Sequence, residues 1–505
     1  MYQTQLTDTI VALSTGQGVA AISVIRMSGS QAVDIADRVF KGKILSKAAS
    51  HSLHYGRIID EEGRHLDDVV IGIFRGPNSY TTQDIIEISC HGSSYIIREV
   101  LALLIRQGAR LAEAGEFTMR AFLNGRMDLS QAEAVADLIA SQSRASHDLA
   151  VQQMRGGVST EIKVLRQKLL DFVSLIELEL DFSEEDVEFA DRTQLRVLVT
   201  EVIDMIRKLK NTFELGNAIR EGIPTVIAGR PNAGKSTLLN ALLEEERAIV
   251  SAIPGTTRDT IEEVLVIDGI QFRLIDTAGI REAHDEIEVI GIKRTMEKIE
   301  QASILIYVFD VTEMKPEDVA RDLEVIQPGH SKVILAPNKM DLNPYSIPES
   351  YSMHNYRVVP LSALNHMNVQ YLKEVLGDLV RKDIPDTGVI ISSARHYHAL
   401  DRAEGRLVDV LRGLGIEDAR LEMPDARLEM PDDRSEMPNA RSEMPDARSE
   451  IPDVRSEMPD DNIKLPTELV AQDIRQAMYH LAEISGEIST EDVLGNIFGR
   501  FCIGK

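Results

Sequence analysis

Apolar and polar positions in the first part of the chain follow the mixed pattern of an α+β domain. Within residues 1–120, the apolar runs Val19–Met27, Asp68–Phe74 and Ile85–Ser89 predict strands, whereas Tyr95–Gln107 has the apolar spacing of a helix. Both kinds of segment fall within a length that one domain can accommodate. We therefore expect residues 1–120 to fold as one domain.

The pattern changes to that of helices after this domain. Apolar residues recur at helical spacing in Ala132–Ala140 and Glu161–Leu180, and again in Ser392–Gly413 and Thr467–Ile484. Between these two groups, residues 220–383 contain short apolar runs typical of buried strands. A domain inserted between two halves of one helical domain is the simplest arrangement.

A tract with a seven-residue repeat separates the last two helical segments. Residues 419–460 hold six copies that begin as A-R-L-E-M-P-D and drift to A-R-S-E-M-P-D. A period of seven is typical of coiled coils, but each copy contains a proline, which breaks helices. Because six arginines stand against twelve acidic residues, we expect an extended, disordered insertion.

A chain of 505 residues should hold two to four domains and bury a large core. The expected fold is multidomain α/β. The predicted segments are an N-terminal α+β domain (1–120), the first part of a helical domain (121–219), an inserted domain (220–383), the helical domain continued (384–418), the repeat insertion (419–460) and the end of the helical domain (461–505).

The inserted domain carries a phosphate-binding loop. Residues 229–236 read G-R-P-N-A-G-K-S, after the apolar run Ile223–Ala228 and before the predicted helix start Ser236–Leu243. Glycines let backbone N–H groups point at a β-phosphate, and Lys235 is expected to reach the β- and γ-oxygens. The Ser236 hydroxyl is the expected Mg²⁺ ligand. A glycine-rich turn without a ligand would be the plainer interpretation, but the strand–loop–helix context argues against it.

Two further motifs complete the phosphate side of the site. D-T-A-G at 276–279 follows the predicted strand Phe272–Ile275, so Asp276 is expected to hold Mg²⁺ through water and the Gly279 amide to meet the γ-phosphate. T-T-R-D at 256–259 places Thr257 as the threonine that senses Mg²⁺.

The base is selected by motifs nearer the end of the domain. N-K-M-D at 338–341 follows the apolar run Val333–Ala336. An aspartate carboxylate accepts two hydrogen bonds from the N1–H and N2–H₂ of guanine, and adenine offers no such pair. S-A-L at 362–364, after Val358–Leu361, fits a loop whose amide contacts the guanine oxygen. Four motifs in this order, each after a predicted strand, predict that residues 220–383 form a Ras-like G domain, a P-loop domain that binds GTP.

The catalytic group that such domains use is replaced in this chain. In Ras-like enzymes a glutamine after D-T-A-G orients the attacking water, but here the position is Ile280, which cannot. Another water-positioning group and another positive charge are therefore needed. The Asn232 amide oxygen could hold a monovalent cation beside the phosphates, or it could merely cap the loop; the residues alone leave both open. The candidate side chains nearby are Arg281, Glu282, Asp285, Glu286 and Glu288.

The net charge and the two cysteines bear on which partners and which cellular compartment are expected. A formal net charge of −26 argues against a broad nucleic-acid-coating surface, so any RNA contact should be local or shared with a partner. The two cysteines, Cys90 and Cys502, lack metal-ligand spacing and fit a reducing compartment. Neither a basic leader followed by an apolar core nor a membrane-length apolar stretch is present in the sequence, so we expect a cytoplasmic protein that does not contact a membrane.

Three segments outside the G domain carry a specific resemblance. They read S-Y-T-T-Q-D-I-I-E-I-S-C-H-G at 79–92, R-L-A-E-A-G-E-F-T-M-R-A-F-L-N-G-R-M-D-L-S-Q-A-E-A-V-A-D-L-I at 110–139 and F-C-I-G-K at 501–505. With them the chain resembles the MnmE (TrmE) family of tRNA modification GTPases over essentially its whole length, except for residues 419–460.

The resemblance implies an activity and its partners. Members of this family are K⁺-stimulated homodimeric GTPases that work with the flavoprotein MnmG, in a heterotetramer-type complex, on the wobble uridine of certain tRNAs. Together the two proteins install an aminomethyl or carboxymethylaminomethyl group at C5, with 5-formyl- or methylene-tetrahydrofolate as the one-carbon source. The N-terminal domain would dimerise and bind the folate, and dimerisation of the G domains would replace an external activator.

The resemblance also assigns roles to residues of the G domain. Asn232 would be a K⁺ ligand, with Ser251, Ile253 and Thr256 in the loop that caps the ion, and Glu288 would orient water in place of the missing glutamine. The catalytic set is then Glu288, Lys235 and Asp276. The expected GTP-contacting residues are Asn232, Ala233, Gly234, Lys235, Ser236, Thr237, Ser251, Ala252, Ile253, Pro254, Gly255, Thr256, Thr257, Asp276, Thr277, Ala278, Gly279, Asn338, Lys339, Asp341, Ser362, Ala363 and Leu364.

In the same way, the resemblance assigns a folate site to the ends of the chain. Arg26, Glu87, Arg126 and Lys505 match the folate-contacting positions, and Cys502 is either a reactive thiol near the folate or a packed one. The first loop, L-S-T-G-Q-G-V-A-A-I-S-V-I-R, departs from the glycine- and proline-containing version usual in the family.

A second function is compatible with the G domain alone. A regulatory or ribosome-assembly GTPase switch would bind and hydrolyse GTP without modification chemistry. Such a switch needs neither the block at 79–139 nor the terminal F-C-I-G-K, so these segments favour the modification enzyme.

Deletion of residues 419–460 is expected to leave GTP hydrolysis nearly intact, because the repeat should loop out from the helical domain. The measurement is the GTPase rate of the deletion variant beside the full chain. A large loss of activity would instead show that the repeat supports the fold.

Overall fold

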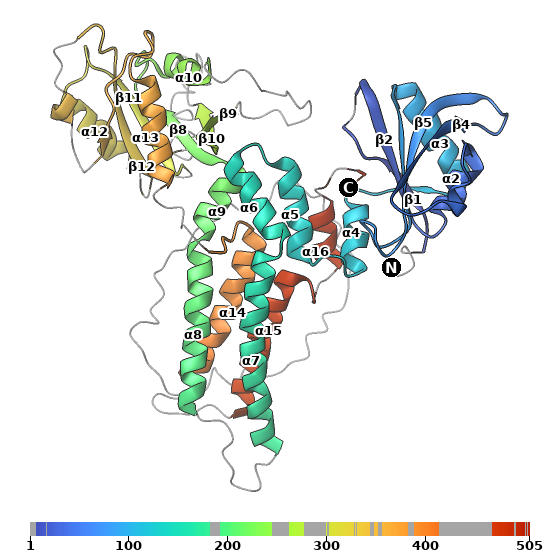
Figure 1. Ribbon diagram of the computed structural model, residues 1–505. Coiled ribbons are helices and arrows are strands. Elements are labelled where there is room, and N and C mark those ends of the chain that lie inside the picture. The colour runs from blue at the N-terminus through green and yellow to red at the C-terminus, as the bar shows by residue number, and fades with distance from the viewer. Residues whose placement is uncertain are drawn as a thin grey trace, which may run out of the picture. The chain divides into compact units, whose positions relative to one another are not determined.

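The structure is a computed structural model that divides into two compact units. Figure 1 labels its helices and strands. The first unit comprises Met1–Lys163, Leu209–His398 and Ala482–Lys505, and the second comprises Val164–Lys208 and Ala399–Leu481. The predicted repeat insertion at 419–460 lies outside the described residues. The structure describes residues 7–16, 18–181, 192–244, 262–276, 299, 302–327, 329, 331–343, 348–351, 356–381, 388–413, 467–488, 491–499, 501 and 503–504.

A seven-stranded sheet in the order β3-β4-β5-β6-β2-β1-β7 forms the N-terminal part of the first unit. Helices α2 (Ala32–Val39) and α3 (Ser94–Arg106) share one hydrophobic core with it, which confirms the predicted α+β domain. Only the β1–β7 pair is parallel. The strands are β1 (Ile10–Leu13), β2 (Ala20–Ser28), β3 (Phe40–Lys41), β4 (Ser52–Ile59), β5 (His65–Phe74), β6 (Ile85–Gly92) and β7 (Arg110–Leu111).

The other face of this sheet carries exposed apolar side chains. Tyr55 pairs with Val70 across β4 and β5, and the two side chains are 70% and 36% exposed. Side chains alternate between faces along a strand, so Leu53, two residues from Tyr55, lies on the same face and is 73% exposed. Val70 in turn pairs with Ser89 on β6, two residues from Glu87. The predicted folate residue Glu87 therefore shares this open face.

The C-terminus packs against helices that follow the N-terminal domain. Helix α16 (Glu491–Phe498), which the sequence pattern did not predict, packs with α4 (Glu116–Leu123) and α5 (Leu129–Ala140). Beyond α16, Ile503 forms a bridge with Ala114, and the Ser14 hydroxyl donates to the Gly504 carbonyl at 3.1 Å. Segments almost five hundred residues apart thus meet. The shared core contains Met119, Leu129, Ala132, Leu494, Phe498 and Phe501.

The inserted domain is built on a six-stranded sheet in the order β13-β12-β11-β8-β10-β9. Only β9 runs antiparallel to its neighbour, as expected for a Ras-like fold. One core packs α10 and α13 on the sheet and a second packs α12. The elements are β8 (Ile223–Ala228), α10 (Lys235–Glu244), β9 (Glu262–Ile267), β10 (Ile270–Asp276), β11 (Ile304–Asp310), α12 (Pro316–Ile326), β12 (Lys332–Asn338), β13 (Arg357–Val358) and α13 (Val369–Arg381).

Helical segments precede and follow the G domain, which confirms the insertion predicted from the sequence. Helix α9 (Phe213–Glu221) leads directly into β8, and residues 388–393 lead from the G domain into α14 (Ala394–Gly413). The Thr212 hydroxyl accepts a hydrogen bond from the Ile391 backbone N–H at 2.9 Å, so the two connections lie side by side.

The turn between β9 and β10 contacts two helices. The Gly269 carbonyl accepts from the Ala145 backbone N–H at 2.9 Å, at the start of α6 (Arg144–Met154). The neighbouring Asp268 forms an ion pair with Arg381 at the end of α13. Both turn residues have positive φ angles, 51° and 80°, typical of a tight hairpin turn. The turn is therefore fixed to the helical part of the unit.

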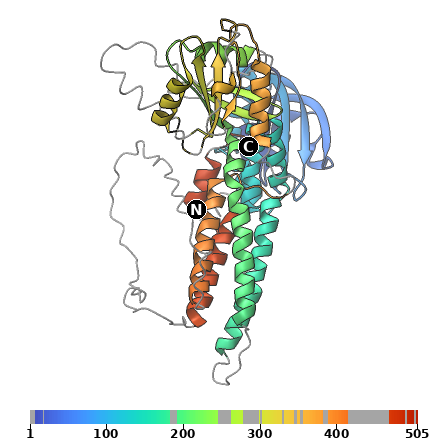
Figure 2. The same ribbon diagram turned by 90° about the vertical axis from the view of Figure 1, so that its left-hand side faces the viewer.

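The second unit contains parts of four long helices that lie side by side (Figure 1, Figure 2). Charged pairs between them include Arg207 with Glu404 at 2.6 Å and Lys168 with Glu201 at 3.3 Å. Across the described part of the chain, none of the helices combines the length and apolar character needed to cross a membrane. The helices are α7 (Gly157–Asp181), α8 (Arg192–Asn211), α14 and α15 (Thr467–Ser485).

A buried charge network joins three helices of the first unit. Glu133 on α5 accepts from Arg395 at 2.8 Å and lies 2.9 Å from His396, both at the start of α14. Arg395 also donates to the carbonyls of Glu483 and Ile484 at the end of α15. Burial raises the pKa of the Glu133 carboxyl, but His396 and Arg395 outweigh it and lower the value to about 2. An ionised Glu133 is therefore part of the fold.

The variant Glu133→Gln is expected to lower the free energy of unfolding by about 1.5–3 kcal/mol at neutral pH, because it leaves the partly buried Arg395 guanidinium without its counter-charge. The folded-state pKa of Glu133 lies below its ordinary value of 4.5, so the stabilisation is complete above that pH and is lost as the pH falls toward about 2. Thermal unfolding measured across this pH window should show the stabilities of the wild-type protein and of Glu133→Gln converging as the pH falls.

The matched control is Glu201→Gln, which removes a carboxylate that is 56% exposed. A shift below about 0.5 kcal/mol is expected for it. Equal stabilities of the Glu133 and Glu201 variants would contradict the structural role of the buried network.

Candidate functional site

The phosphate loop runs from the end of β8 to the start of α10, as the sequence predicts. Gly229 has φ 150°, and a Cβ atom there would lie 1.9 Å from the Val308 carbonyl oxygen on β11. Gly234 has φ 95°, and its Cβ would lie 2.2 Å from the Asn338 side-chain nitrogen. Neither position can hold a side chain without displacing its neighbour. The two glycines let the loop lie directly against β11 and against the guanine motif.

Lys235 reaches back over the loop from the first residue of α10. Its Nζ atom donates to the carbonyls of Gly229 at 2.9 Å and Arg230 at 3.0 Å. Ser236 and Thr237 follow at the exposed start of the helix, where backbone N–H groups and the helix dipole favour a phosphate. The structure thus brings the predicted residues Asn232, Ala233, Gly234, Lys235, Ser236 and Thr237 together at one helix N-terminus.

Asn338 connects the phosphate loop to the segment predicted to bind the base. It is 3% exposed at the end of β12, its Nδ2 atom donates to the Ala233 carbonyl at 2.8 Å, and its Oδ1 atom accepts from the Ala363 backbone N–H at 3.0 Å. The sequence assigned Asn338 to nucleotide binding, and its role as a bridge between two loops was not predicted. Ser362 and Ala363 are buried beside it, and Leu364 is 75% exposed.

Lys339 and Asp310 form a pair that the sequence motifs did not include. The Lys339 Nζ atom donates to the Asp310 carboxylate at 2.6 Å, and Asp310 also accepts from the Thr312 backbone N–H at 2.8 Å. Burial opposes ionisation of Asp310, but the bonds from Lys339 and Thr312 outweigh it and hold the pKa of that carboxyl below its usual value. An aspartate directly after the apolar run 304–309 was the available signal. Asp341 lies in an exposed position nearby.

The Mg²⁺ side of the site is only partly within the described residues. Asp276 ends β10 and pairs with Ile227 on β8, so its backbone lies beside the strand that leads into the phosphate loop. The parallel pairing of β10 with β8 therefore places the start of D-T-A-G next to the loop. The predicted residues that lie outside the described ones are Ser251, Ala252, Ile253, Pro254, Gly255, Thr256, Thr257, Thr277, Ala278, Gly279 and Glu288.

A cavity of about 360 Å³ in the N-terminal domain contains two of the predicted folate residues. Glu87 and Arg126 both line it, together with Tyr80 and Ser79 from the block at 79–92. Arg26 donates from its Nε and Nη2 atoms to Glu87 at 2.9 and 2.8 Å, and its guanidinium lies 5.7 Å from the Tyr80 ring centroid. Arg26 is thus not a lining residue and reaches the cavity through Glu87. Cys502 and Lys505 lie outside the described residues.

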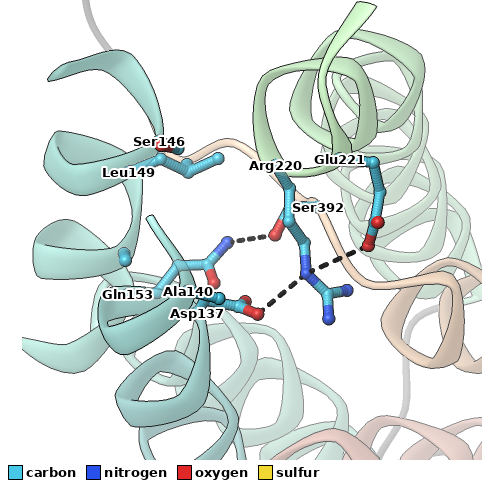
Figure 3. Close-up of a pocket in the computed structure, with 9 residues that line it drawn as sticks. Asp137, Ala140, Ser146, Leu149, Gln153, Arg220, Glu221 and Ser392 are labelled. Atoms are coloured by element: carbon cyan, nitrogen blue, oxygen red, sulfur yellow. Dashed lines mark hydrogen bonds and ion pairs between the residues drawn. The ribbon is translucent and has the colours of Figure 1, made fainter. Parts of the chain in front are cut away.

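A smaller cavity of about 140 Å³ lies where the two connections to the G domain meet the helical part of the unit (Figure 3). Asp137 on α5 faces Arg220 at the end of α9, and the Arg220 Nε atom donates to its carboxylate at 2.9 Å. Gln153 on α6 points at the returning segment and donates to the Ser392 hydroxyl at 2.8 Å. Burial raises the pKa of Asp137 despite the neighbouring Arg220. These contacts hold one connection to α5 and the other to α6.

Comparisons with known proteins cover both ends and the middle of the chain. The family described as the GTP-binding protein TrmE N-terminus matches residues 9–126, and the MnmE helical domain matches residues 129–430. Three proteins named tRNA modification GTPase MnmE are similar over 99% of this chain and 99% of their own length. They come from Cytophaga hutchinsonii (48% identical), Flavobacterium johnsoniae (46%) and Bacteroides fragilis (43%).

This chain belongs to the MnmE family of tRNA modification GTPases. Membership confirms the resemblance inferred from the three motif segments and the expectation of a GTP-hydrolysing enzyme. It also confirms the predicted fold of an N-terminal domain, a helical domain and an inserted G domain. The domain boundaries and the individual site residues stay predictions.

The bridge through Asn338 makes a prediction about nucleotide binding. In Asn338→Ala the Ala233 carbonyl and the Ala363 N–H lose a buried partner, at about 1–3 kcal/mol each. The affinity for GDP, measured with a fluorescent GDP analogue, is therefore expected to fall about tenfold or more.

The control is Asn343→Ala, which removes a side chain whose contact with the Val311 carbonyl is long, at 3.5 Å. It should keep an affinity within about twofold of the wild type. An equal loss in the two variants would show that the Asn338 bridge does not support the site.

Proposed function

We propose that this protein hydrolyses GTP in the service of tRNA wobble-uridine modification. The observation that carries the proposal is the junction at Asn338, where a phosphate loop and a guanine-selective segment share one buried side chain. Membership of the MnmE family, with relatives similar over their whole length, supports tRNA as the object of the modification.

Binding of GTP would use side chains and backbone N–H groups that already lie around the N-terminus of α10. The β-phosphate would lie over the N-terminus of α10, where Lys235 can exchange its bonds with two loop carbonyls for phosphate oxygens. Ser236, with Thr257 and Asp276, would hold Mg²⁺, which neutralises charge developing on the β- and γ-phosphates. Asp341 would accept from guanine, and the loop formed by Ser362, Ala363 and Leu364 would turn a backbone amide toward the guanine oxygen.

Hydrolysis would depend on a cation and on a carboxylate remote from the loop in sequence. Ile280 cannot orient water, so the proposal gives that role to Glu288. Asn232 is an exposed residue with a φ of 62°, a backbone conformation that non-glycine residues seldom adopt, at the outer edge of the phosphate loop. This supports a ligand role for its amide oxygen toward K⁺, with Ser251, Ile253 and Thr256 completing the ion site.

The GTPase rate is expected to be higher in K⁺ than in Na⁺ at equal ionic strength. Glu288→Ala should lower kcat by about 100-fold, because the attacking water would no longer be oriented, with little change in GTP affinity. Equal GTPase rates of the wild-type protein in the two salts would contradict the cation proposal. Full activity of Glu288→Ala would exclude a role of that residue in the mechanism.

The one-carbon chemistry is proposed for the cavity in the N-terminal domain. Its volume of about 360 Å³ suits a small organic ligand, and Arg126 offers a cation for the glutamate tail of a tetrahydrofolate. The C-terminal segment is held at Ser14, and Ala12, two residues earlier, pairs with Arg26, which supports a contribution from Lys505. Calorimetric titration with 5-formyl-tetrahydrofolate tests this assignment, and an absence of binding would remove folate from the proposal.

Partners are proposed from charge and from exposed surface. The strongly acidic chain leaves most of the tRNA contact to a second protein, for which the flavoprotein MnmG is the candidate. The apolar sheet face with Leu53, Tyr55 and Val70 supports a homodimer formed through the N-terminal domain.

Sedimentation equilibrium of the protein alone tests the homodimer, and the same measurement with MnmG and tRNA tests the complex. A monomer at all concentrations would exclude the dimer. The proposed compartment is the cytoplasm.

The deciding experiment is mass spectrometry of wobble nucleosides in tRNA from cells that lack this gene. Loss of the C5-aminomethyl-type uridines, with recovery on return of the wild-type gene, supports the modification enzyme. Persistence of these nucleosides without a second gene copy would favour a regulatory GTPase switch.

A further inference from the structure

The second residue of the phosphate loop, Arg230, is held from outside the loop. Its Nε and Nη2 atoms donate to the two carboxylate oxygens of Asp322 on α12, at 2.8 and 2.7 Å. Such a planar two-bond contact fixes the orientation of the guanidinium as well as its position. Arg230 is half-exposed and Asp322 is 21% exposed, so solvent only partly screens the pair.

A third side chain fixes the carboxylate itself. The hydroxyl of Tyr307 on β11 donates to the same Asp322 oxygen that accepts from Arg230 Nε. Tyr307 is 1% exposed in the core that α12 forms with the sheet, beside Val319 and Leu323. Burial raises the pKa of Asp322, but bonds from Arg230 and Tyr307 outweigh it and lower the value. A rigid, ionised acceptor therefore faces the loop.

The loop conformation beyond Arg230 depends on the same residue. The Arg230 carbonyl accepts from the Ala233 backbone N–H at 3.3 Å and from Lys235 Nζ at 3.0 Å, so the turn that contains Asn232 closes on Arg230. One position earlier, Gly229 lies against the carbonyl of Val308, the neighbour of Tyr307 on β11. The loop is thus held at two adjacent residues, at the backbone by Val308 and at the side chain by Asp322.

We propose that Asp322 is a positioning residue for GTP hydrolysis: with Tyr307 it holds Arg230, and through Arg230 it sets the turn that presents Asn232. The inference rests on the proposed GTPase function and on the cation role of Asn232 within it. It also assigns Arg230 to loop support and not to the phosphates, because both of its bonded nitrogens are directed at Asp322.

The test is a double-mutant cycle of Arg230→Ala and Asp322→Ala, with kcat, KM for GTP and the K⁺ concentration that gives half-maximal rate as readouts. Each single variant should raise the half-activating K⁺ concentration about five- to tenfold, less than the full loss of a charged hydrogen bond because solvent partly screens the pair, while KM changes less than about twofold. The double variant should be no worse than either single one. Saturating K⁺ should restore most of the rate.

Tyr307→Phe and Arg321→Ala complete the series. Tyr307→Phe removes one bond to Asp322 and keeps the ring, so a smaller shift in the same direction is expected. Arg321→Ala removes a side chain 72% exposed that pairs with Asp318 on the same helix, and it should leave all three readouts unchanged. Additive losses in the double variant, or loss in Arg230→Ala with full activity in Asp322→Ala, would overturn the proposal, because Arg230 would then act without Asp322.

Failure of the proposed function is separable from failure of this inference. If the wild-type protein hydrolyses no GTP or ignores K⁺, the proposed function fails, and the dissociation rate of a fluorescent GDP analogue then takes the place of the kinetic readouts. Faster release in both single variants, without a further increase in the double variant, would support the role of Asp322 in loop position. Unchanged release would reject it.

Discussion

The side-chain amide of Asn338 ties the guanine segment to the phosphate loop, and the remaining geometry of the G domain is arranged around it. Its two ends engage Ala233 and Ala363, which lie on different connections of the sheet. Gly234 must lack a side chain because the same amide occupies that space. Strand β11 adds the second support, since Val308 touches Gly229 and Asp310 holds Lys339. The segments predicted to bind the base and the phosphates therefore share one set of contacts.

The pattern of apolar residues along the sequence predicted helices and strands well where burial alone determines which residues are apolar. The run Ile223–Ala228 is β8 as predicted, because a parallel strand buried on both faces is apolar throughout. The strand predicted over Val358–Leu361 differs in its bounds, because β13 covers only Arg357–Val358. The backbone N–H groups of Val359 and Leu361 still donate to the carbonyls of Leu335 and Pro337 on β12. Helix α16 was missed because its apolar face is matched by α4, which lies far away in sequence.

Motifs in the sequence locate the candidate site residues, but only the fold shows which side chains support them. The phosphate loop could be read from its glycines, but the partner of Arg230 could not, because nothing in the sequence near Asp322 distinguishes it from other helix carboxylates. In the N-terminal domain, Glu87 and Arg126 line one cavity, whereas Arg26 acts on it through a cross-strand pair with Glu87. Only the register of β2 against β6 defines that relation.

The turn between β9 and β10 affects how the protein can be labelled. A two-residue hairpin turn with an aspartate and a glycine is where an epitope tag or a fluorophore would ordinarily be inserted. Here Asp268 is held by Arg381 and Gly269 by Ala145, so an insertion would separate the G domain from α6. The turn at Gly63, between β4 and β5, has no atom within 4 Å of the space where a side chain would begin. A probe placed there would report on the protein without disturbing a contact on which the nucleotide domain relies.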